Sequence, residues 1–439
     1  MAQLASGYAQ TRRDNIVVIL ADDLGYGDLS CFGGRRVQTP NLDRLAREGM
    51  RFTDFHSNGA VCSPTRAALL TGRYPQRAGI ETALGENARG LDRGQITLAR
   101  RLRDAGYSTA LFGKWHLGYN PENGPQHHGF AEFRGLLHGA HDYFSHVDQY
   151  GRMDWWHNDK PVNEPGYTTH LITRHASRYI ESHKDQPFFL YVSHAAIHFP
   201  WMTPDDQPYR QQGVRHEDLR KLGPHQEKDV GPVVCRMIAS LDDSVGQIMA
   251  ALRRSGLDHR TLVFFTSDNG GYLRYQGGFV NISDNGPLRG QKGGLYEGGH
   301  RVPGIAWWPG QIKAGSVCRE IVATMDLMPT MLALAGTSVD PRLDGIDLLP
   351  CLLEGCCMPE RTLFWRTNQT GAVRRGPWKL IMPLADRASA ELFHLERDSG
   401  EHTNVAVHRP NEVSELRKAY EQWENDVGAP PRAGMRNEV

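Results

Sequence analysis

The chain has 439 residues, which exceeds the usual size of a single hydrophobic core and indicates one large domain with a smaller one. Its 50 lysines and arginines balance its 50 aspartates and glutamates, so the formal net charge is zero. This balance excludes a bulk attraction to nucleic acid or to an anionic membrane surface, and neither partner is expected. Any affinity for anions must come from a local cluster, and the oligomeric state stays open.

The cysteines and the hydropathy exclude two further classes. There are seven cysteines, an odd number, without the paired CxxC spacing of a zinc ribbon, so free thiols are the simplest expectation. The longest apolar runs are too short to span a membrane. The first residues lack the apolar stretch of a secretory signal. The expected location is therefore the cytoplasm, or the periplasm or exterior if a signal has been removed.

Short apolar runs alternate with helical periods along the first 340 residues. Strands are predicted at residues 16–20, 51–56, 107–112, 188–192, 262–265 and 305–308. Helices are predicted at residues 41–49, 98–106, 168–182, 233–252 and 327–334. Residues 119–166, rich in Gly, His, Trp and Tyr, indicate a long ordered loop. The alternation predicts an α/β fold with a large, mostly parallel mixed sheet flanked by helices.

The pattern changes after about residue 340. Short alternating pieces at 362–366, 378–382 and 392–395 are followed by a helical period at 411–424. These pieces predict a small antiparallel sheet with an appended helix. The expected division is a large domain over residues 1–340 and a small C-terminal α+β subdomain over residues 341–439.

The run VCSPTRAALLTGR, residues 61–73, holds the most unusual combination of side chains. Proline is tolerated in the first turn of a helix, so Pro64 places Cys62 at or just before a helix N-terminus. Arg66 then lies one turn further on the same face. A lone cysteine in such a place is most often a buried structural residue. The run as a whole favours a reactive side chain with a cation fixed beside it.

Polar clusters directly follow four of the predicted buried strands. Ligands of open α/β sheets bind at the carboxyl ends of the strands, so these clusters are expected to converge. An all-oxygen set of aspartates and an asparagine suits calcium or magnesium, although each pair alone is commonly a turn or cap. The clusters are Asp22-Asp23, Lys114 with His116, His194 with His198, and Asp268-Asn269.

A charge count indicates the kind of ligand. Three carboxylates against a divalent metal, two lysines (Lys114 and Lys292) and Arg66 leave the site positive by about two charges. Lys292 lies in a glycine-rich loop over residues 286–294. Such a site suits an anionic group, a sulfate or phosphate ester.

Six motifs between Asp22 and about Gly310 resemble those of one family: ADDLGYGD, CSPTRAALLTGR, GKWHLG, SHAAIHFP, SDNGG and LRGQKGGLYEGG. The chain resembles the type I, formylglycine-dependent sulfatases of the alkaline-phosphatase superfamily. Within this family it resembles the arylsulfatase and N-acetylgalactosamine-6-sulfatase type. The resemblance implies that residues 1–340 form the catalytic domain. It also implies that a formylglycine-generating enzyme converts Cys62 to formylglycine during maturation.

The resemblance further implies the roles of the matched residues. One Ca²⁺ would be bound by Asp22, Asp23, Asp268, Asn269 and the modified Cys62. Arg66 and Lys114 would hold the formylglycine hydrate and the sulfate, and His116 would take the proton that lets the intermediate collapse. His198 and Lys292 would bind the ester and assist departure of the alcohol. The implied substrate is a small-molecule or oligosaccharide sulfate ester, a sulfated carbohydrate or an aryl sulfate. Candidate sugar contacts are His194, His138, His141 and Trp155.

Three alternatives remain open at this point. The chain could be a phosphoester or phosphonate hydrolase of the same superfamily, but Asn269 stands where two-zinc members commonly carry histidine. It could be a non-catalytic glycan-binding relative with Cys62 unmodified. It could also be a hydrolase with a Cys-His pair. The sulfate position and exo or endo action are not determined by the sequence.

Overall fold

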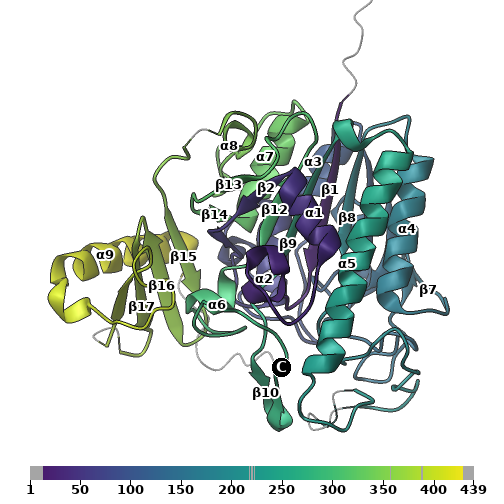
Figure 1. Ribbon diagram of the computed structural model, residues 1–439, viewed down its shortest axis with the longest axis horizontal. Coiled ribbons are helices and arrows are strands. Elements are labelled where there is room, and N and C mark those ends of the chain that lie inside the picture. Colours follow the sequence, from purple (N-terminus) through teal and green to yellow (C-terminus); the bar gives the residue numbers. More distant parts are fainter. Residues whose placement is uncertain are drawn as a thin grey trace, which may run out of the picture.

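The computed structural model describes residues 13–428 except 217, 219, 220, 222, 356, 387 and 388. Within these ranges, ten strands form one mixed sheet in the order β13-β2-β12-β9-β1-β8-β4-β5-β6-β7 (Figure 1). No helix in the described ranges combines the length and apolarity needed to cross a bilayer.

The centre of this sheet is parallel. Its strands are β9 (Thr261–Ser267), β1 (Asn15–Ala21), β8 (Phe188–Ser193), β4 (Ser108–Lys114) and β5 (Glu132–Leu136). Strand β1 pairs in parallel with both β8 and β9, and all seven of its residues are buried. Continuous burial on both faces explains its unbroken apolar sequence. The predicted mostly parallel mixed sheet is confirmed.

Antiparallel strands complete both edges of the sheet. Strand β12 (Gly304–Trp307) runs antiparallel to β9 and to β2 (Met50–Phe52), and β13 (Ser316–Cys318) lies beyond β2. At the opposite edge, β6 (Trp156–His157) and β7 (Lys160–Pro161) form a short antiparallel extension of β5. Two small ribbons stand apart from this sheet. They pair β3 (Phe55–His56) with β14 (Val322–Ala323), and β10 (Arg274–Tyr275) with β11 (Phe279–Val280).

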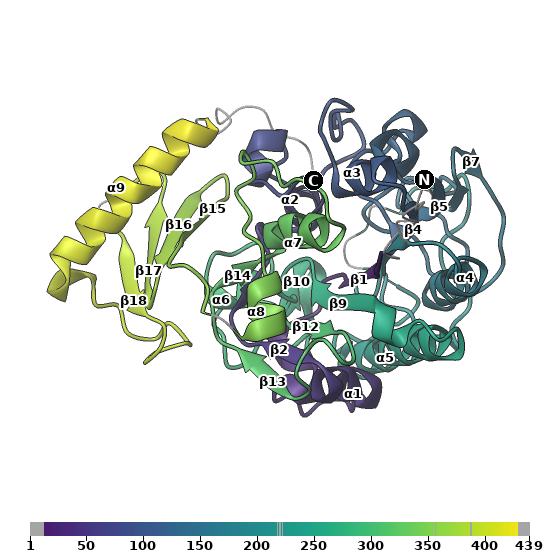
Figure 2. The ribbon, with the colours of Figure 1, turned by 90° about the horizontal axis from the view of Figure 1, so that it is seen from above.

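Helices cover both faces of the large sheet (Figure 2). Side chains of a strand alternate between faces, so Val17 and Ile19 of β1 belong to one core cluster and Val18 and Leu20 to another. The first cluster is closed by α1 (Pro40–Glu48), α4 (Thr168–Ser182) and α5 (Gly231–Arg254). The second is closed by α2 (Cys62–Thr71), α3 (Leu98–Asp104), α7 (Leu327–Leu334) and α8 (Leu349–Glu354).

The described C-terminal part forms a separate layer beside the large sheet (Figures 1 and 2). Four antiparallel strands follow in order, β15 (Thr362–Arg366), β16 (Thr370–Arg375), β17 (Trp378–Pro383) and β18 (Glu391–His394). Helix α9 (Pro410–Val427) packs across β16 and β17 with Leu416, Tyr420 and Trp423 buried. The domain boundary at residue 340 stays a prediction, and α8, which follows it, packs in the core of the large sheet.

A buried network of charged side chains, called here the buried ion network, joins the C-terminal sheet to the large part. Lys379 of β17 donates to Glu297 of α6 (Glu297–His300) at 2.8 Å, lies 3.0 Å from the His300 ring nitrogen and forms an ion pair with Glu401 at 2.9 Å. Three carboxylates and three cations balance within the network. Its members are Asp54, His56, Glu297, His300, Arg301, Arg374, Lys379 and Glu401.

Two histidine rings link the cations and the carboxylates of the network. His300 Nε2 lies 3.0 Å from Lys379 Nζ and 3.3 Å from the carbonyl oxygen of Leu295. The Nδ1 atoms of His300 and His56 are 3.1 Å apart, and His56 Nε2 lies 2.7 Å from Asp54 Oδ1 and 3.1 Å from Arg374 Nη1. Burial lowers the pKa of both rings. A continuous set of polar contacts therefore links Lys379 to Asp54.

Two secondary-structure predictions were wrong in detail, and further elements were not predicted. The strand predicted at 51–56 is interrupted and becomes β2 and β3, which join different partners. The predicted loop over 119–166 contains β5, whose residues EFRGL carry too weak an alternation to indicate a strand. Strand β16, residues TGAVRR, and the short helix α8 were not predicted. The six described cysteines are free, as expected, although the Sγ atoms of Cys318 and Cys351 lie 3.5 Å apart.

Candidate active site

The polar clusters predicted at strand ends meet at one edge of the sheet because β9, β1, β8 and β4 are direct neighbours. Asp22 and Asp23 follow β1, Lys114 ends β4, and Asp268 and Asn269 follow β9. Positions 194–198 continue from β8 on the same edge.

Cys62 is the first residue of α2, and every residue of this helix is buried. Its Sγ lies 3.6 Å from Asp22 Oδ1 and 3.2 Å from Lys292 Nζ. Burial raises the pKa of the Cys62 thiol to about 12 despite the neighbouring lysines. An unmodified Cys62 is therefore a poor source of thiolate, which argues against the Cys-His hydrolase.

Three carboxylates and one amide crowd the floor of the site. Burial and the negative charges of Asp268 and Asp23 raise the pKa of Asp22 to about 7. Asn269 Nδ2 donates to Asp23 Oδ1 at 2.8 Å, whereas the buried Asn269 Oδ1 has no hydrogen-bond partner among the described residues. Ligand atoms of Asp22, Asp23, Cys62 and His198 all lie within 4.8 Å of one another. The carboxylate oxygens of Asp22, Asp23 and Asp268 and the unpaired amide oxygen of Asn269 fit a hard divalent cation.

Each carboxylate has its own buried cation. Lys114 Nζ lies 2.5 Å from Asp22 Oδ2, and Lys292 Nζ lies 2.5 Å from Asp23 Oδ1. Arg66 holds Asp268 Oδ2 with Nε at 3.1 Å and Nη2 at 2.7 Å. Arg66 and Lys114 are fully buried and pair with these carboxylates, whereas Lys292 lines the pocket, and contact of Arg66 and Lys114 with the sulfate stays a prediction.

Two histidines lie at the pocket with opposite tautomers. His116 Nε2 donates to the carbonyl of Leu84 at 3.1 Å, which leaves the buried Nδ1 without a partner among the described residues. Burial and the charges of Lys114 and Arg66 hold the pKa of His116 well below its usual value. His198 Nδ1 donates to the carbonyl of Phe199 at 2.8 Å, so its Nε2 faces Asp23 Oδ2 at 3.8 Å. Burial and the charges of Lys114 and Lys292 also lower the pKa of His198, so the neutral form of both rings is favoured.

The backbone is strained at this edge. Asp23 and His116 adopt left-handed conformations with φ of 63° and 53°, which L-residues other than glycine rarely do. Gly113 of β4 has φ of 114°, and a Cβ there would lie 1.8 Å from the carbonyl oxygen of Ser193. Strain of this kind is concentrated at functional sites.

A pocket of about 420 Å³ opens above the floor. Its reacting end is formed by Cys62, His116, His198 and Lys292. An aromatic wall and an amide-rich wall, neither of which was predicted, complete it. The first consists of Phe199, Tyr272 and Tyr275, and the second of Gln76, Glu81, Arg366, Thr367, Asn368 and Gln369. No local pattern marks these positions, because the second wall forms only when the turn after β15 meets residues 76–83.

The predicted sugar contacts do not reach this pocket. His194 bonds Ser244 of α5 at 3.0 Å, His141 bonds Thr168 at 2.9 Å, and Trp155 Nε1 donates to Glu164 at 2.9 Å. All three are essentially fully buried, so direct contact with a substrate is corrected to a role in packing.

His138 does not line the pocket either. Its Nδ1 lies 2.6 Å from Asp148, and its ring stacks on Tyr119, which contacts His116. His138 therefore contacts the active site indirectly, through Tyr119 and His116.

Two protein-family models match the sequence of this chain. The model described as Sulfatase matches residues 14–337, most of the chain. The chain belongs to the sulfatase family. A second model, N-sulphoglucosamine sulphohydrolase, C-terminal, matches residues 291–425 of this sulfatase and covers its C-terminal sheet.

Individual relatives agree with the family. The sulfatase is 38% identical to N-acetylgalactosamine-6-sulfatase of Mus musculus over 403 residues, covering 86% of this chain and 73% of that protein. It is 37% identical to arylsulfatase A of Homo sapiens over 407 residues, covering 84% and 74%. The crystal structure of Ps i-CgsB in complex with k-i-k-neocarrahexaose has a TM-score of 0.83 at 30% identity, covering 95% and 94%. The sulfatase is thus an enzyme that hydrolyses sulfate esters.

Proposed function

We propose that this sulfatase removes the sulfate ester of a sulfated carbohydrate, using a formylglycine derived from Cys62 and one calcium ion. The observation that carries the proposal is the contact of Cys62 with Asp22 and Lys292 beside an unpaired, buried Asn269 Oδ1. A formylglycine-generating enzyme is the partner that the Cys62–Arg66 sequence implies.

The residues fit the calcium ion. Calcium takes six to eight oxygen ligands, and Asp22, Asp23, Asp268 and Asn269 Oδ1 supply carboxylate and amide oxygens at one point. When bound, the ion offsets the mutual repulsion of the carboxylates and stabilises negative charge on the ester oxygens. Arg66 and Lys114 hold two of these carboxylates from below, so the ligands are preorganised.

Formylglycine supplies a hydrated aldehyde with two hydroxyls on one carbon, one to attack sulfur and one whose deprotonation releases sulfate. His116 Nδ1 has a free lone pair, and its low pKa keeps the ring neutral, so it can accept that proton. Lys292 Nζ, 3.2 Å from Cys62 Sγ, lies where it can bind the ester oxygens. His198 presents Nε2 at the pocket and carries a proton to the leaving oxygen once the anionic ester raises its pKa.

The pocket walls support a carbohydrate as the leaving group. Tyr272 and Tyr275 offer an apolar body for the carbon face of a sugar ring. Gln76, Asn368 and Gln369 on the amide-rich wall offer donors and acceptors for hydroxyl groups. A volume of about 420 Å³ lies in the range of small-molecule sites.

Two measurements on protein from the native host test this proposal. Peptide mass spectrometry determines the chemical state of residue 62, and elemental analysis determines the calcium content. We expect an aldehyde at position 62, one calcium per chain, and turnover of sulfated sugars. Asn269→Ala should lower the calcium content and leave the aldehyde in place. Sulfatase activity with an intact thiol at position 62 would refute the proposed nucleophile, and activity on aryl sulfates alone would refute the carbohydrate substrate.

A further inference from the structure

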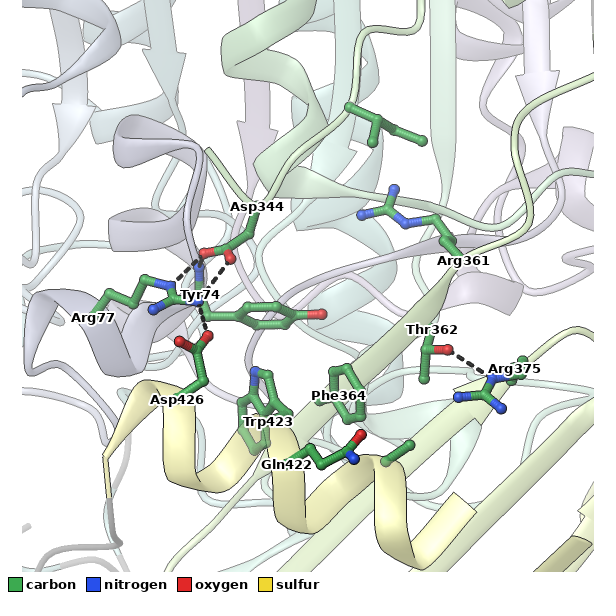
Figure 3. A pocket seen from close by; sticks show the side chains of 12 residues that line it. Tyr74, Arg77, Asp344, Arg361, Thr362, Phe364, Arg375, Gln422, Trp423 and Asp426 are labelled. Carbon is green, nitrogen blue, oxygen red and sulfur yellow. Dashed lines mark hydrogen bonds and ion pairs between the residues drawn. The ribbon is translucent and has the colours of Figure 1, made fainter. Parts of the chain in front are cut away.

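A second hollow of about 480 Å³ lies outside the active site, between the large part and the C-terminal layer (Figure 3). We propose that it binds an anionic sugar unit of a polymeric substrate while another unit occupies the active site. This inference rests on the proposed carbohydrate substrate. The side chains concerned are Tyr74, Arg77, Asp344, Arg361, Phe364 and Arg375.

The anion-binding groups are two arginines on either side of Thr362 of β15. Arg375 donates through Nε to Thr362 Oγ1 at 2.9 Å and has no carboxylate at ion-pair distance within the described ranges. Its two Nη groups are left for a ligand. Arg361 Nη1 donates to Asp326 Oδ2 at 2.6 Å, and the guanidinium also lines the hollow (Figure 3). A guanidinium donates in a planar fork that matches the oxygens of a sulfate or carboxylate.

The opposite side of the hollow is aromatic. Phe364 stacks on Trp423 with ring centroids 5.1 Å apart and planes 7° from parallel, and Tyr74 packs edge-on against both. Arg366 also lies over the Trp423 ring, 5.6 Å from its centroid. An apolar ring beside unpaired guanidinium donors suits a sugar with a carbon face and an anionic substituent.

The carboxylates near the hollow are paired with arginines and therefore do not repel a bound anion. Asp344 accepts from Arg77 Nε at 2.8 Å, and Asp426 forms a close ion pair with the same guanidinium. Asp326 is paired with Arg361 and buried. Among the described residues that line the hollow, the acidic side chains are thus paired, and Arg375 is the charge without a counter-charge.

The hollow and the active-site pocket share their dividing elements. In the short 3₁₀ helix Pro75–Ala78, Pro75 and Gln76 line the active site, whereas Tyr74 and Arg77 on either side of this pair line the hollow. On β15, Phe364 lines the hollow and Arg366, two residues on, lines the active site. Same-face neighbours on a strand are about 7 Å apart. The hollow and the active-site pocket are therefore neighbours. In the proposed arrangement one glycan chain reaches both, and the second attachment point raises the effective affinity for long substrates.

The test compares two substrates that differ in length. Arg375→Ala should raise KM about tenfold for a sulfated hexasaccharide, because one or two charge-assisted hydrogen bonds are lost. KM and kcat for the matching monosulfated monosaccharide should not change. Arg397→Ala, an exposed arginine of the same subdomain, is the matched control and should leave both substrates unaffected. Arg375→Gln, which keeps a donor for Thr362, should give the same loss with less disturbance of the fold.

Each outcome is decisive for the hollow. Equal changes in KM on both substrates, no change on either, or the same loss in Arg397→Ala would overturn the inference. Failure of the proposed function is distinguishable, because the unsubstituted enzyme would then release no sulfate from the monosaccharide.

Discussion

Substitution of Lys379 by methionine tests whether the buried ion network holds the C-terminal sheet against the catalytic loops. Methionine has nearly the same length but no charge and no donor. Lys379 is fully buried, donates to Glu297 at 2.8 Å, lies 3.0 Å from the His300 ring nitrogen and forms an ion pair with Glu401 at 2.9 Å. The substitution leaves two buried carboxylates sharing a site without their common cation.

The magnitude follows from the partners that remain. Glu297 keeps Arg301 at 3.2 Å and Arg374 at 3.4 Å, whereas Glu401 is left with no cation at ion-pair distance in the described ranges. Removing one partner from a buried ion pair costs about 3–5 kcal/mol. The expected fall in the free energy of unfolding lies in that range, and urea unfolding followed by tryptophan fluorescence measures it.

The control is Lys418→Met on the exposed face of α9, which should change the free energy of unfolding by less than about 0.5 kcal/mol. In the double variant Lys379→Met/Glu401→Gln, the charge left without a partner is removed, so part of the loss should be recovered. A loss below about 1 kcal/mol in Lys379→Met, or no recovery in the double variant, would show that the network is not the stabilising contact described.

The remaining predictions concern pH, thiols and one glycine. Burial lowers the pKa of His194 from 6.5 to about 3, so the unfolded chain binds one more proton than the folded chain between these pH values. Stability is therefore lost as the pH falls below about 6.5, by up to about 1.4 kcal/mol per pH unit, and urea midpoints for His194→Gln should show a shallower acid dependence. Mild oxidation with the reagent diamide should form a disulfide between Cys318 and Cys351, whose Sγ atoms are 3.5 Å apart, and raise the free energy of unfolding by about 3–4 kcal/mol. The same treatment should leave the free energy of unfolding of Cys351→Ser unchanged. Gly113→Ala should be destabilised by more than about 2 kcal/mol in the same unfolding assay, because its Cβ would overlap the Ser193 carbonyl in a left-handed conformation.

The sequence predicted the floor of the site well because each strand places its polar cluster by chain adjacency alone. Asp22 follows β1 and Asp268 follows β9, so knowledge of a parallel sheet was enough to bring them together. The division between pocket and interior could not be predicted in this way. His194 and His198 are four residues apart, yet only His198 lines the pocket, because His194 turns toward Ser244 of α5.

The amide-rich wall and the buried ion network escaped prediction for a related reason. Lys379 and Glu297 are 82 positions apart and carry no motif that links them. From the sequence alone, Lys379 and Glu297 are expected to be exposed surface charges, because lysine and glutamate are rarely buried unless paired. Only the docking of one layer on another turns them into partners. The same docking makes Asn368 and Gln369, otherwise turn residues, part of the active-site pocket.

The complete burial of α2 has a consequence for the life history of the enzyme. Cys62, Ser63, Pro64, Thr65 and Arg66 are all buried, and Arg66 donates two hydrogen bonds to Asp268. A modifying enzyme that binds these five residues as an extended peptide would have to act before the sheet closes around them. The proposed conversion of Cys62 thus competes with folding in time. A molecule that folds first keeps its thiol for as long as it stays folded. The fraction of active molecules in a preparation would then depend on the relative rates of Cys62 conversion and of folding.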